Sequence, residues 1–167
     1  TRETLDFFKC LAEDVKTYPE FNGKGILWVH LMPYYQETLQ QYMNYQEKYY
    51  IQACDLNLDY MEPLDAAHPL EALAKKMILN IYNGPYERKV EMIRHLVKEF
   101  QSDAVIHFCH WGCKQTSGAA QLVKRRLEAA GFPTLVLDGD GCDSGNVNDG
   151  QMVTRLQAFL ELLEGCR

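Results

Sequence analysis

The sequence of 167 residues has no long hydrophobic run and no surplus of positive charge. No apolar stretch approaches the roughly 20 residues that a transmembrane helix needs, so we expect no membrane association. The formal net charge of −6 at pH 7 disfavours binding to nucleic acid and to anionic lipid. The densest basic run, VKRRLE at 123–128, has the composition of a solvated helix face. We therefore expect neither nucleic acid nor a membrane as a partner.

Nucleotide-binding motifs and a secretion signal are also missing. No Gly-x-Gly-x-x-Gly follows the first expected strand, and no Gly-x4-Gly-Lys-Ser occurs, so dinucleotide and P-loop binding lack support. The first residues, TRETLDFFKC, are polar and acidic rather than signal-like, which predicts a cytoplasmic protein. The chain begins at Thr1 instead of Met, and we expect it to be processed or cut from a longer protein.

The cysteines are too scattered for a disulfide framework, and without a secretion signal reduced thiols are expected. The six are Cys10, Cys54, Cys109, Cys113, Cys142 and Cys166. Cys54 lies in an expected strand and Cys109 ends another, where buried, inert thiols are the usual case. Cys10 and Cys166 lie near the chain ends, and we assign them no role. Cys109, Cys113 and Cys142 remain as candidates for chemistry.

Short apolar runs alternate with amphipathic segments along the chain. Expected strands cover 25–31, 49–57, 103–109 and 134–140; expected helices extend to 18 and cover 34–46, 68–82, 86–100, 116–131 and 151–165. Nearly continuous apolar strands that alternate with helices predict an α/β fold, a Rossmann-like or flavodoxin-like open sheet. Right-handed crossovers favour four parallel strands in the order 2-1-3-4 with helices on both faces. We expect residues 1–20 to link to a missing preceding domain, and 21–167 to form a single domain.

Two expected helices carry clear apolar stripes. In 68–82 the stripe consists of Leu70, Leu73, Met77 and Ile81. In 151–165 the residues expected to face inward are Met152, Leu156, Phe159 and Leu163. Gly131, followed by Pro133, is placed to end the helix before the fourth strand.

In an open sheet of this order, ligands bind beyond the carboxyl ends of the strands at the switch point between strands 1 and 3. HLMPYY (30–35) and CHWGCKQTSG (109–118) occupy those ends. Cys113 precedes a helix and adjoins Lys114, which favours a thiolate that could act as nucleophile or soft-metal ligand. A half-buried structural thiol is the alternative. His110 shares this loop and could carry a proton near neutral pH. His30 and His107 lie in strands or at their ends, where a histidine is more often a core residue than a catalytic one.

Metal sites are possible but weakly marked. A zinc site of Cys109, His110, Cys113 and Cys142 would need a Cys-x3-Cys pair, which is looser than the usual spacing. An iron–sulfur cluster needs three or four ligands, more than this chain offers, so the others would come from another part of a longer chain. The acidic loop 140–150 lacks the alternation and final glutamate of a calcium loop. We interpret it as a glycine-rich loop close to the site, with no metal of its own.

The segment DAVIHFCHWGCKQTSGAAQLVKRRLEAAGFPTLVLDGDGCDSGN, followed by GQMVTRLQAFLELL, resembles the 2-hydroxyacyl-CoA dehydratase component D family. ILWVHLMPYY and NIYNGPYERKVEMI are similar to it as well, so the resemblance covers about residues 22 to 164. The family contains 2-hydroxyglutaryl-CoA dehydratase subunits and is related to benzoyl-CoA reductase subunits. It implies Rossmann-like domains, in agreement with the expected sheet.

The resemblance also implies a mechanism and partners. Each family subunit holds a [4Fe-4S] cluster through three cysteines, and Cys113 matches the one from the last domain. Two subunits form a heterodimer, and an ATP-hydrolysing activator injects one electron. The (R)-2-hydroxyacyl-CoA becomes a ketyl radical that loses hydroxide from C2, and return of the electron gives the (E)-2-enoyl-CoA in an oxygen-free cytosol. The chain lacks the domain with the other two ligands, so alone we expect it to hold no cluster and to be inactive.

The expected site follows from these two lines of reasoning. His110 is the candidate catalytic residue, Cys113 is the candidate cluster ligand, and the expected substrate-cleft residues are His30, Trp111, Lys114, Gln115 and Ser117. Three alternatives stay open. The domain could be a non-catalytic assembly surface, with a buried Cys113 and a large apolar patch. It could serve a benzoyl-CoA reductase-like acyl-CoA reductase. A stand-alone thiol enzyme would require Cys113 and His110 within hydrogen-bond reach.

Overall fold

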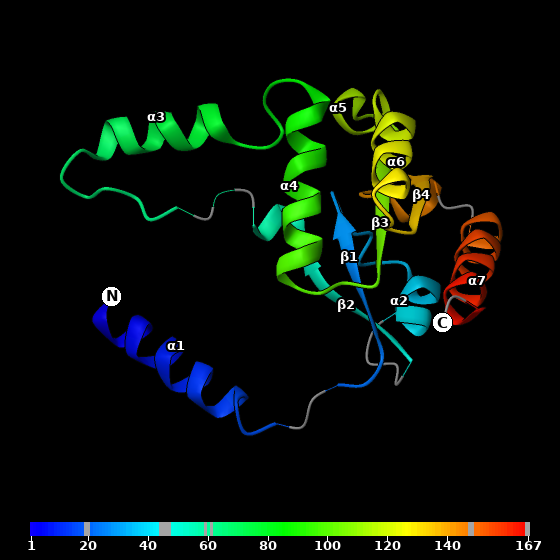
Figure 1. Ribbon diagram of the computed structural model, residues 1–167, viewed down its shortest axis with the longest axis horizontal. Helices are drawn as coiled ribbons and strands as arrows, with labels where there is room; N and C mark the ends of the chain where they lie inside the picture. The colour runs from blue at the N-terminus through cyan, green and yellow to red at the C-terminus, as the bar shows by residue number, and fades with distance from the viewer. Residues whose placement is uncertain (19–20, 44–47, 59, 61, 147–148, 166–167) are drawn as a thin grey trace.

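A four-stranded sheet forms the centre of the molecule (Figure 1). The computed structural model describes residues 1–18, 21–43, 48–58, 60, 62–146 and 149–165. The strands are β1 (Lys24–Val29), β2 (Tyr49–Cys54), β3 (Ala104–His110) and β4 (Thr134–Gly139). All three pairings are parallel, and the strand order is β2-β1-β3-β4. This confirms the open parallel sheet predicted from the sequence.

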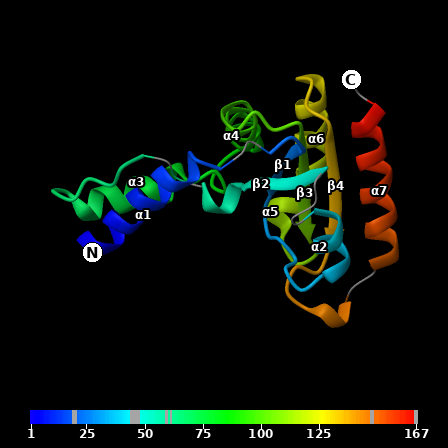
Figure 2. The ribbon, with the colours of Figure 1, turned by 90° about the horizontal axis from the view of Figure 1, so that it is seen from below.

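Helices cover both faces of the sheet (Figure 2). In chain order the helical elements are α1 (Arg2–Val15), α2 (Glu37–Met43), η1 (Asp55–Asn57), α3 (Pro69–Leu79), α4 (Tyr86–Glu99), α5 (Lys114–Ser117), α6 (Ala120–Ala129), η2 (Ser144–Asn146) and α7 (Asp149–Gly165). Trp28 and Phe108 point to the layer of α2 and α7, where their rings stack with centroids 6.0 Å apart. Leu27 and Val105 point to the layer of α4 and α6. Both faces of β1 and β3 are therefore buried, as their apolar sequences require.

One expected helix is divided in two at Gly118 and Ala119, where Ala119 leaves the helical conformation with φ −115° and ψ 5°. The segment predicted as a helix over 116–131 forms α5 and α6, with a break at Gly118 and Ala119. A Cβ atom on residue 118 would lie 2.7 Å from the main-chain oxygen of Lys114, so only glycine fits there without a shift. At the other end of α6, Gly131 has a φ of +89° and terminates the helix as expected.

Two helices project from one side of the domain and bury little (Figures 1 and 2). Helix α1 has no buried residue, and α3 buries only Ala72. In the apolar stripe of α3, the side chains of Leu70 and Met77 are 82% and 69% exposed. Ile81 lies beyond the end of α3 and is buried. Of the predicted stripe, Ile81 is therefore buried, whereas the members within α3 itself are exposed among the described residues.

The stripe of α7 is buried nearly as expected. Met152, Leu156 and Leu163 lie in the core, and Leu160 occupies the remaining buried place. Phe159 is only partly buried at the edge of this cluster. A straight 3.6-residue period allows either neighbour to face inward, and in the structure it is Leu160 that does so.

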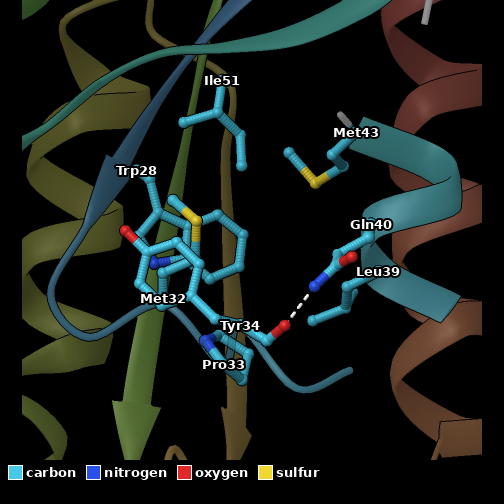
Figure 3. Close-up of a pocket in the computed structure, with 8 residues that line it drawn as sticks. All are labelled: Trp28, Met32, Pro33, Tyr34, Leu39, Gln40, Met43 and Ile51. Atoms are coloured by element: carbon cyan, nitrogen blue, oxygen red, sulfur yellow. Dashed lines mark hydrogen bonds between the residues drawn. The ribbon is translucent and has the colours of Figure 1, made fainter. Parts of the chain in front are cut away.

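A small apolar cavity of about 20 Å³ lies between α2 and strands β1 and β2 (Figure 3). Its lining residues are Trp28, Met32, Pro33, Tyr34, Leu39, Gln40, Met43 and Ile51. The Gln40 amide donates to the main-chain oxygen of Tyr34 across its rim. A space of this size holds little more than one water molecule, so we treat it as a packing feature. No helix in the described part of the chain is both long enough and apolar enough to cross a bilayer.

Candidate functional site

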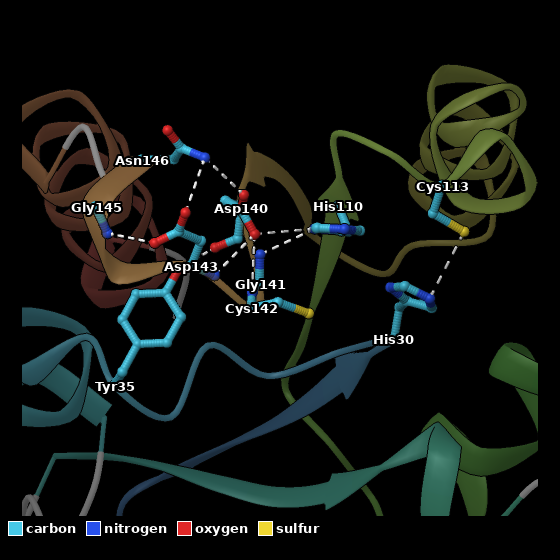
Figure 4. Close-up of polar contacts among 10 residues, drawn as sticks. All are labelled: His30, Tyr35, His110, Cys113, Asp140, Gly141, Cys142, Asp143, Gly145 and Asn146. Carbon is cyan, nitrogen blue, oxygen red and sulfur yellow. Dashed lines mark hydrogen bonds and ion pairs between the residues drawn. The ribbon is translucent and has the colours of Figure 1, made fainter.

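The loops that follow β1 and β3 meet at the carboxyl edge of the sheet (Figure 4). After β3, the amide of Cys113 donates to the main-chain oxygen of His110 at 2.9 Å, which closes a tight turn before α5. After β1, His30 begins the connection towards α2. The thiol of Cys113 and Nε2 of His30 lie 3.9 Å apart, although 83 positions separate them in the chain. The switch point predicted from the topology thus contains a cysteine–histidine pair.

The surroundings of Cys113 favour the thiolate. The residue is partly exposed, directly before α5. Its pKa is lowered from the ordinary value, first by hydrogen bonding from the Thr116 side chain and then by the main-chain amides of Thr116 and Gln115. Lys89 adds a weaker favourable charge. The hydroxyl of Ser117 donates to the main-chain oxygen of Cys113 at 2.9 Å, which helps to fix this turn. A partly exposed thiolate is the form of cysteine that binds soft metal centres.

His30 is held in place by a buried carboxylate. Its φ of +77° lies in the left-handed region, which residues other than glycine adopt in only a few per cent of cases, histidine, asparagine and aspartate more often than the rest. Its amide donates to Oδ1 of Asp55 at 2.6 Å, and the hydroxyl of Tyr82 donates to Oδ2 of the same residue at 2.7 Å. The rings of His30 and Tyr82 meet edge to face, with centroids 5.8 Å apart. Asp55 is fully buried directly after β2, so three elements fix the imidazole beside Cys113.

The imidazole of His30 is neutral at physiological pH. Burial, and to a smaller extent the nearby charges of Lys89 and His110, lower its pKa to about 4. Nδ1 is buried and has no hydrogen-bond partner among the described residues. An unpaired acceptor nitrogen is less costly than an unpaired N–H, so the proton belongs on Nε2, where it faces the sulfur. His30 can therefore donate a hydrogen bond to a Cys113 thiolate.

A second histidine and a lysine lie buried behind this pair. Nζ of Lys89 and Nε2 of His107 are 3.4 Å apart, and the ammonium lies 5.1 Å from the centroid of the Tyr82 ring. Burial lowers the pKa of Lys89, and burial together with the Lys89 charge lowers the pKa of His107 to about 3. Both side chains line a cleft of about 240 Å³.

The expected cleft residues separate into two groups in the structure. Lys114 and Gln115 line the cleft beside Lys89, and the Gln115 amide donates to the main-chain oxygen of Tyr82 at 3.2 Å. Trp111 is 55% exposed and borders a different, smaller hollow near α7. Ser117 is exposed and bonded to the backbone of Cys113. The structure thus brings Lys114 and Gln115 to the cleft and His30 to Cys113.

His110 belongs to a separate cluster with the loop after β4 (Figure 4). Nδ1 of His110 accepts a hydrogen bond from the amide of Gly141 at 2.9 Å and lies 3.6 Å from a carboxylate oxygen of Asp140. Candidate ligand atoms of His110, Asp140 and Cys142 lie within 4.8 Å of one another. Tyr35, from the loop after β1, donates to the main-chain oxygen of Asp140.

This grouping differs from the two alternatives considered for the cysteines, a zinc site that includes Cys109 and Cys113 and a thiol enzyme that pairs Cys113 with His110. Among the described residues, the potential ligands that gather are His110, Asp140 and Cys142, without Cys109 or Cys113. Cys109 is buried, and burial raises its pKa to about 11. The described contact of the Cys113 thiol is with the imidazole of His30 rather than with that of His110. The geometry required for a thiol enzyme built on Cys113 and His110 is therefore not found in the described part of the chain.

Sequence reasoning misses Asp55, Tyr82 and Lys89. A signal for Asp55 is its position directly after β2, at the edge of the sheet where ligands bind. A signal for Lys89 is its helical spacing with Ile93 and Leu96, which places a lysine on the buried face of α4. Nothing in the local pattern distinguishes Tyr82 from the other tyrosines.

Comparisons with known proteins bear on the same residues. A family model described as 2-hydroxyglutaryl-CoA dehydratase, D-component, matches residues 1–163, and thus includes α1. The chain is 28% identical to the (R)-phenyllactyl-CoA dehydratase alpha subunit of Clostridium sporogenes over 178 residues, 98% of this chain and 42% of that subunit. It is 33% identical to the (R)-2-hydroxyglutaryl-CoA dehydratase subunit alpha of Acidaminococcus fermentans over 79 residues, 47% of this chain and 17% of that subunit. The chain spans less than half the length of these relatives.

Proposed function

The chain belongs to the 2-hydroxyglutaryl-CoA dehydratase D-component family, and we propose that it is part of a subunit of an (R)-2-hydroxyacyl-CoA dehydratase. The reaction would remove the hydroxyl group from C2 and a proton from C3 as water, leaving the (E)-2-enoyl-CoA. The observation that supports this role most is the position of Cys113. Its partly exposed thiol lies at the ligand-binding edge of the sheet, 3.9 Å from Nε2 of His30.

We infer that Cys113 is one ligand of a [4Fe-4S] cluster. Its thiolate-favouring surroundings suit this role, whereas Cys54 and Cys109 are buried and each has a pKa raised to about 11. The other ligands would come from residues outside this chain. When bound, the cluster would supply a low-potential electron to the thioester, which favours loss of hydroxide from C2.

The chain's own residues would hold the ligand and the substrate in position. His30 donates from Nε2 toward the sulfur of Cys113, and Asp55 holds the His30 backbone in the conformation that allows this. Lys114 and Gln115, on the helix that follows Cys113, would contact the acyl-CoA. His110 accepts at Nδ1 from the amide of Gly141, so in its neutral form the proton lies on Nε2, and it is the candidate proton carrier.

Partners and compartment follow from the same proposal. The named relatives are alpha subunits, which supports a second subunit that completes a heterodimer. An ATP-hydrolysing activator would deliver the electron, in an oxygen-free cytoplasm. The benzoyl-CoA reductase-like alternative would use the same cysteine for acyl-CoA reduction.

The test is anaerobic reconstitution of the subunit that contains this chain, with Cys113→Ala and Cys142→Ala compared. Iron and sulfide content, absorption and electron paramagnetic resonance report the cluster. We expect the wild type and Cys142→Ala to bind about four irons, and Cys113→Ala to lose most of the signal because a ligand is removed. Equal cluster content in all three proteins would show that Cys113 is not a ligand.

A second candidate, a non-catalytic assembly role, is favoured by the exposed apolar residues of α1 and α3. It predicts that Cys113→Ala leaves cluster content and turnover unchanged, while Leu70→Glu together with Met77→Glu prevents association with the second subunit. Size-exclusion chromatography with light scattering measures that association. Loss of the cluster in Cys113→Ala would contradict the purely structural role.

A further inference from the structure

The cleft between α4, the loop before it and α5 has an unusual charge for this protein. Its volume is about 240 Å³, and its polar lining includes Lys89, His107, Lys114 and Gln115. No carboxylate is among the described residues that line it, although the whole chain carries a net charge of −6. The cleft opens beside α5, the helix that begins directly after Cys113. A locally positive hollow in an acidic protein indicates an anionic ligand.

Lys89 is a buried cation without a carboxylate partner at salt-bridge distance. Its side chain is 3% exposed, and none of the ion pairs found among the described residues includes it. Its described contacts are Nε2 of His107 at 3.4 Å and the face of the Tyr82 ring. The buried carboxylate of Asp55, whose charge favours the ammonium form of Lys89, already accepts from the His30 amide and the Tyr82 hydroxyl. A buried ammonium in such surroundings destabilises the fold unless an anion joins it.

His107 adds a second donor that needs an acceptor. An ammonium group can only donate, so the Nε2 atom of His107 that faces Lys89 must accept. The proton of the neutral imidazole then lies on Nδ1. This atom is buried and has no hydrogen-bond partner among the described residues. His107 is fully buried and, like Lys89, forms part of the cleft wall. Lys89 and His107 thus present hydrogen-bond donors without acceptors among the described residues. Native proteins usually satisfy buried polar groups of this kind.

We propose that this cleft binds an oxyanion, a carboxylate or a phosphate, with the ammonium of Lys89 as its charged donor. Lys114 at the rim supplies a second positive charge, and the amide of Gln115 closes the side nearest Tyr82. The identification of the anion as part of an acyl-CoA rests on the proposed function, whereas the anion site itself does not. The two possible sources are a carboxylate at the end of the acyl chain and a phosphate of the coenzyme.

The test measures binding of two thioesters to the cluster-free protein by isothermal titration calorimetry. Glutaryl-CoA has a carboxylate at the end of its acyl chain and butyryl-CoA does not. The variants are Lys89→Met and, as the matched control, Lys98→Met, an exposed lysine on the same helix. We expect Lys89→Met to weaken binding about tenfold or more through loss of a charge-assisted hydrogen bond. Lys98→Met should leave binding within about twofold of the wild type.

The outcomes distinguish the sources. Weaker binding of glutaryl-CoA alone assigns the cleft to the acyl carboxylate, and equal weakening of both thioesters assigns it to a coenzyme phosphate. Equal affinity of Lys89→Met and Lys98→Met, or no binding to the wild type, overturns the proposal. Because no cluster is present, these results are independent of the reconstitution with Cys113→Ala.

A second measurement requires no variant. Binding should shift the ring resonances of His107 in the nuclear magnetic resonance spectrum of the wild-type protein, with saturation at the calorimetric affinity. Glutaryl-CoA binding without any change at His107 would place the ligand elsewhere and overturn the proposal. The folded state of Lys89→Met is checked by urea denaturation, where we expect stability equal to or above the wild type because an unpaired buried charge is removed.

Discussion

The buried carboxylate of Asp55 should be the most sensitive polar position of the site. Replacement by alanine removes the acceptor of two buried or partly buried donors, the His30 amide at 2.6 Å and the Tyr82 hydroxyl at 2.7 Å. Each unsatisfied buried donor costs about 1–3 kcal/mol. Part of this cost is offset, because the variant no longer buries the Asp55 carboxylate and the left-handed backbone of His30 can relax. We therefore expect Asp55→Ala to lower the free energy of unfolding by about 2–4 kcal/mol.

Urea denaturation followed by circular dichroism measures this loss. Asp65→Ala is the control because Asp65 also accepts hydrogen bonds, from Ala67 and His68, but its side chain is 59% exposed. The control should change stability by no more than about 0.5 kcal/mol. Asp55→Asn should lie between the two, since it keeps one acceptor oxygen for the His30 amide. Hydrogen exchange of that amide should accelerate in Asp55→Ala. If Asp55→Ala were no more destabilising than Asp65→Ala, the idea that Asp55 holds His30 would be refuted.

Three further predictions concern titration, backbone and thiols. His107 has an ordinary pKa of 6.5 and a folded-state pKa of about 3, so its neutral form contributes stability that is lost as the pH falls from 6.5 through 3. Between pH 7 and pH 5 this loss is about 2 kcal/mol, and urea titrations at both pH values should show a smaller loss in His107→Gln. Gly131 has a φ of +89°, so Gly131→Ala should destabilise the fold by about 1 kcal/mol in thermal unfolding. Gly150 lies in α7 with open space around it, so Gly150→Ala should stabilise the fold by about 0.5 kcal/mol. Opposite or equal signs would contradict the backbone argument. Iodoacetamide should label Cys113 in the native protein but reach Cys54 and Cys109 only after unfolding, as read by peptide mass spectrometry; early labelling of Cys54 would disprove its burial.

The sheet could be predicted from the sequence because its strands are nearly continuous apolar runs that alternate with amphipathic segments. Burial on two faces leaves little freedom in a parallel sheet, and the alternation with helices then determines the order. The division between α5 and α6 could not be predicted in the same way. Gly118 keeps helical dihedral angles and an i→i−4 hydrogen bond to Lys114, and the break becomes visible only in the backbone of Ala119, with φ −115° and ψ 5°.

The candidate site was predictable only in part, since it joins residues that are distant in the chain. The motif around Cys113 indicates a reactive thiol, and the topology indicates the end of β1, but neither selects His30 over His110 as its neighbour. That choice depends on the left-handed backbone of His30 and on the carboxylate of Asp55, which comes from a third strand end. The pattern of a single sequence reports the spacing of residues along one element, whereas this site joins residues from the ends of three strands.

The apolar stripe of α3 shows the same limit in another form. Periodicity states that Leu70 and Met77 share a face, and the structure confirms their shared helix but leaves both exposed. An amphipathic pattern is a property of the helix alone, and it does not identify the surface that covers it. Lys89 presents the opposite case, because its spacing places it on a buried face although its charge argues for solvent. In both cases the environment departs from what the local pattern alone predicts: an apolar face is exposed in α3, and a charge is buried at Lys89.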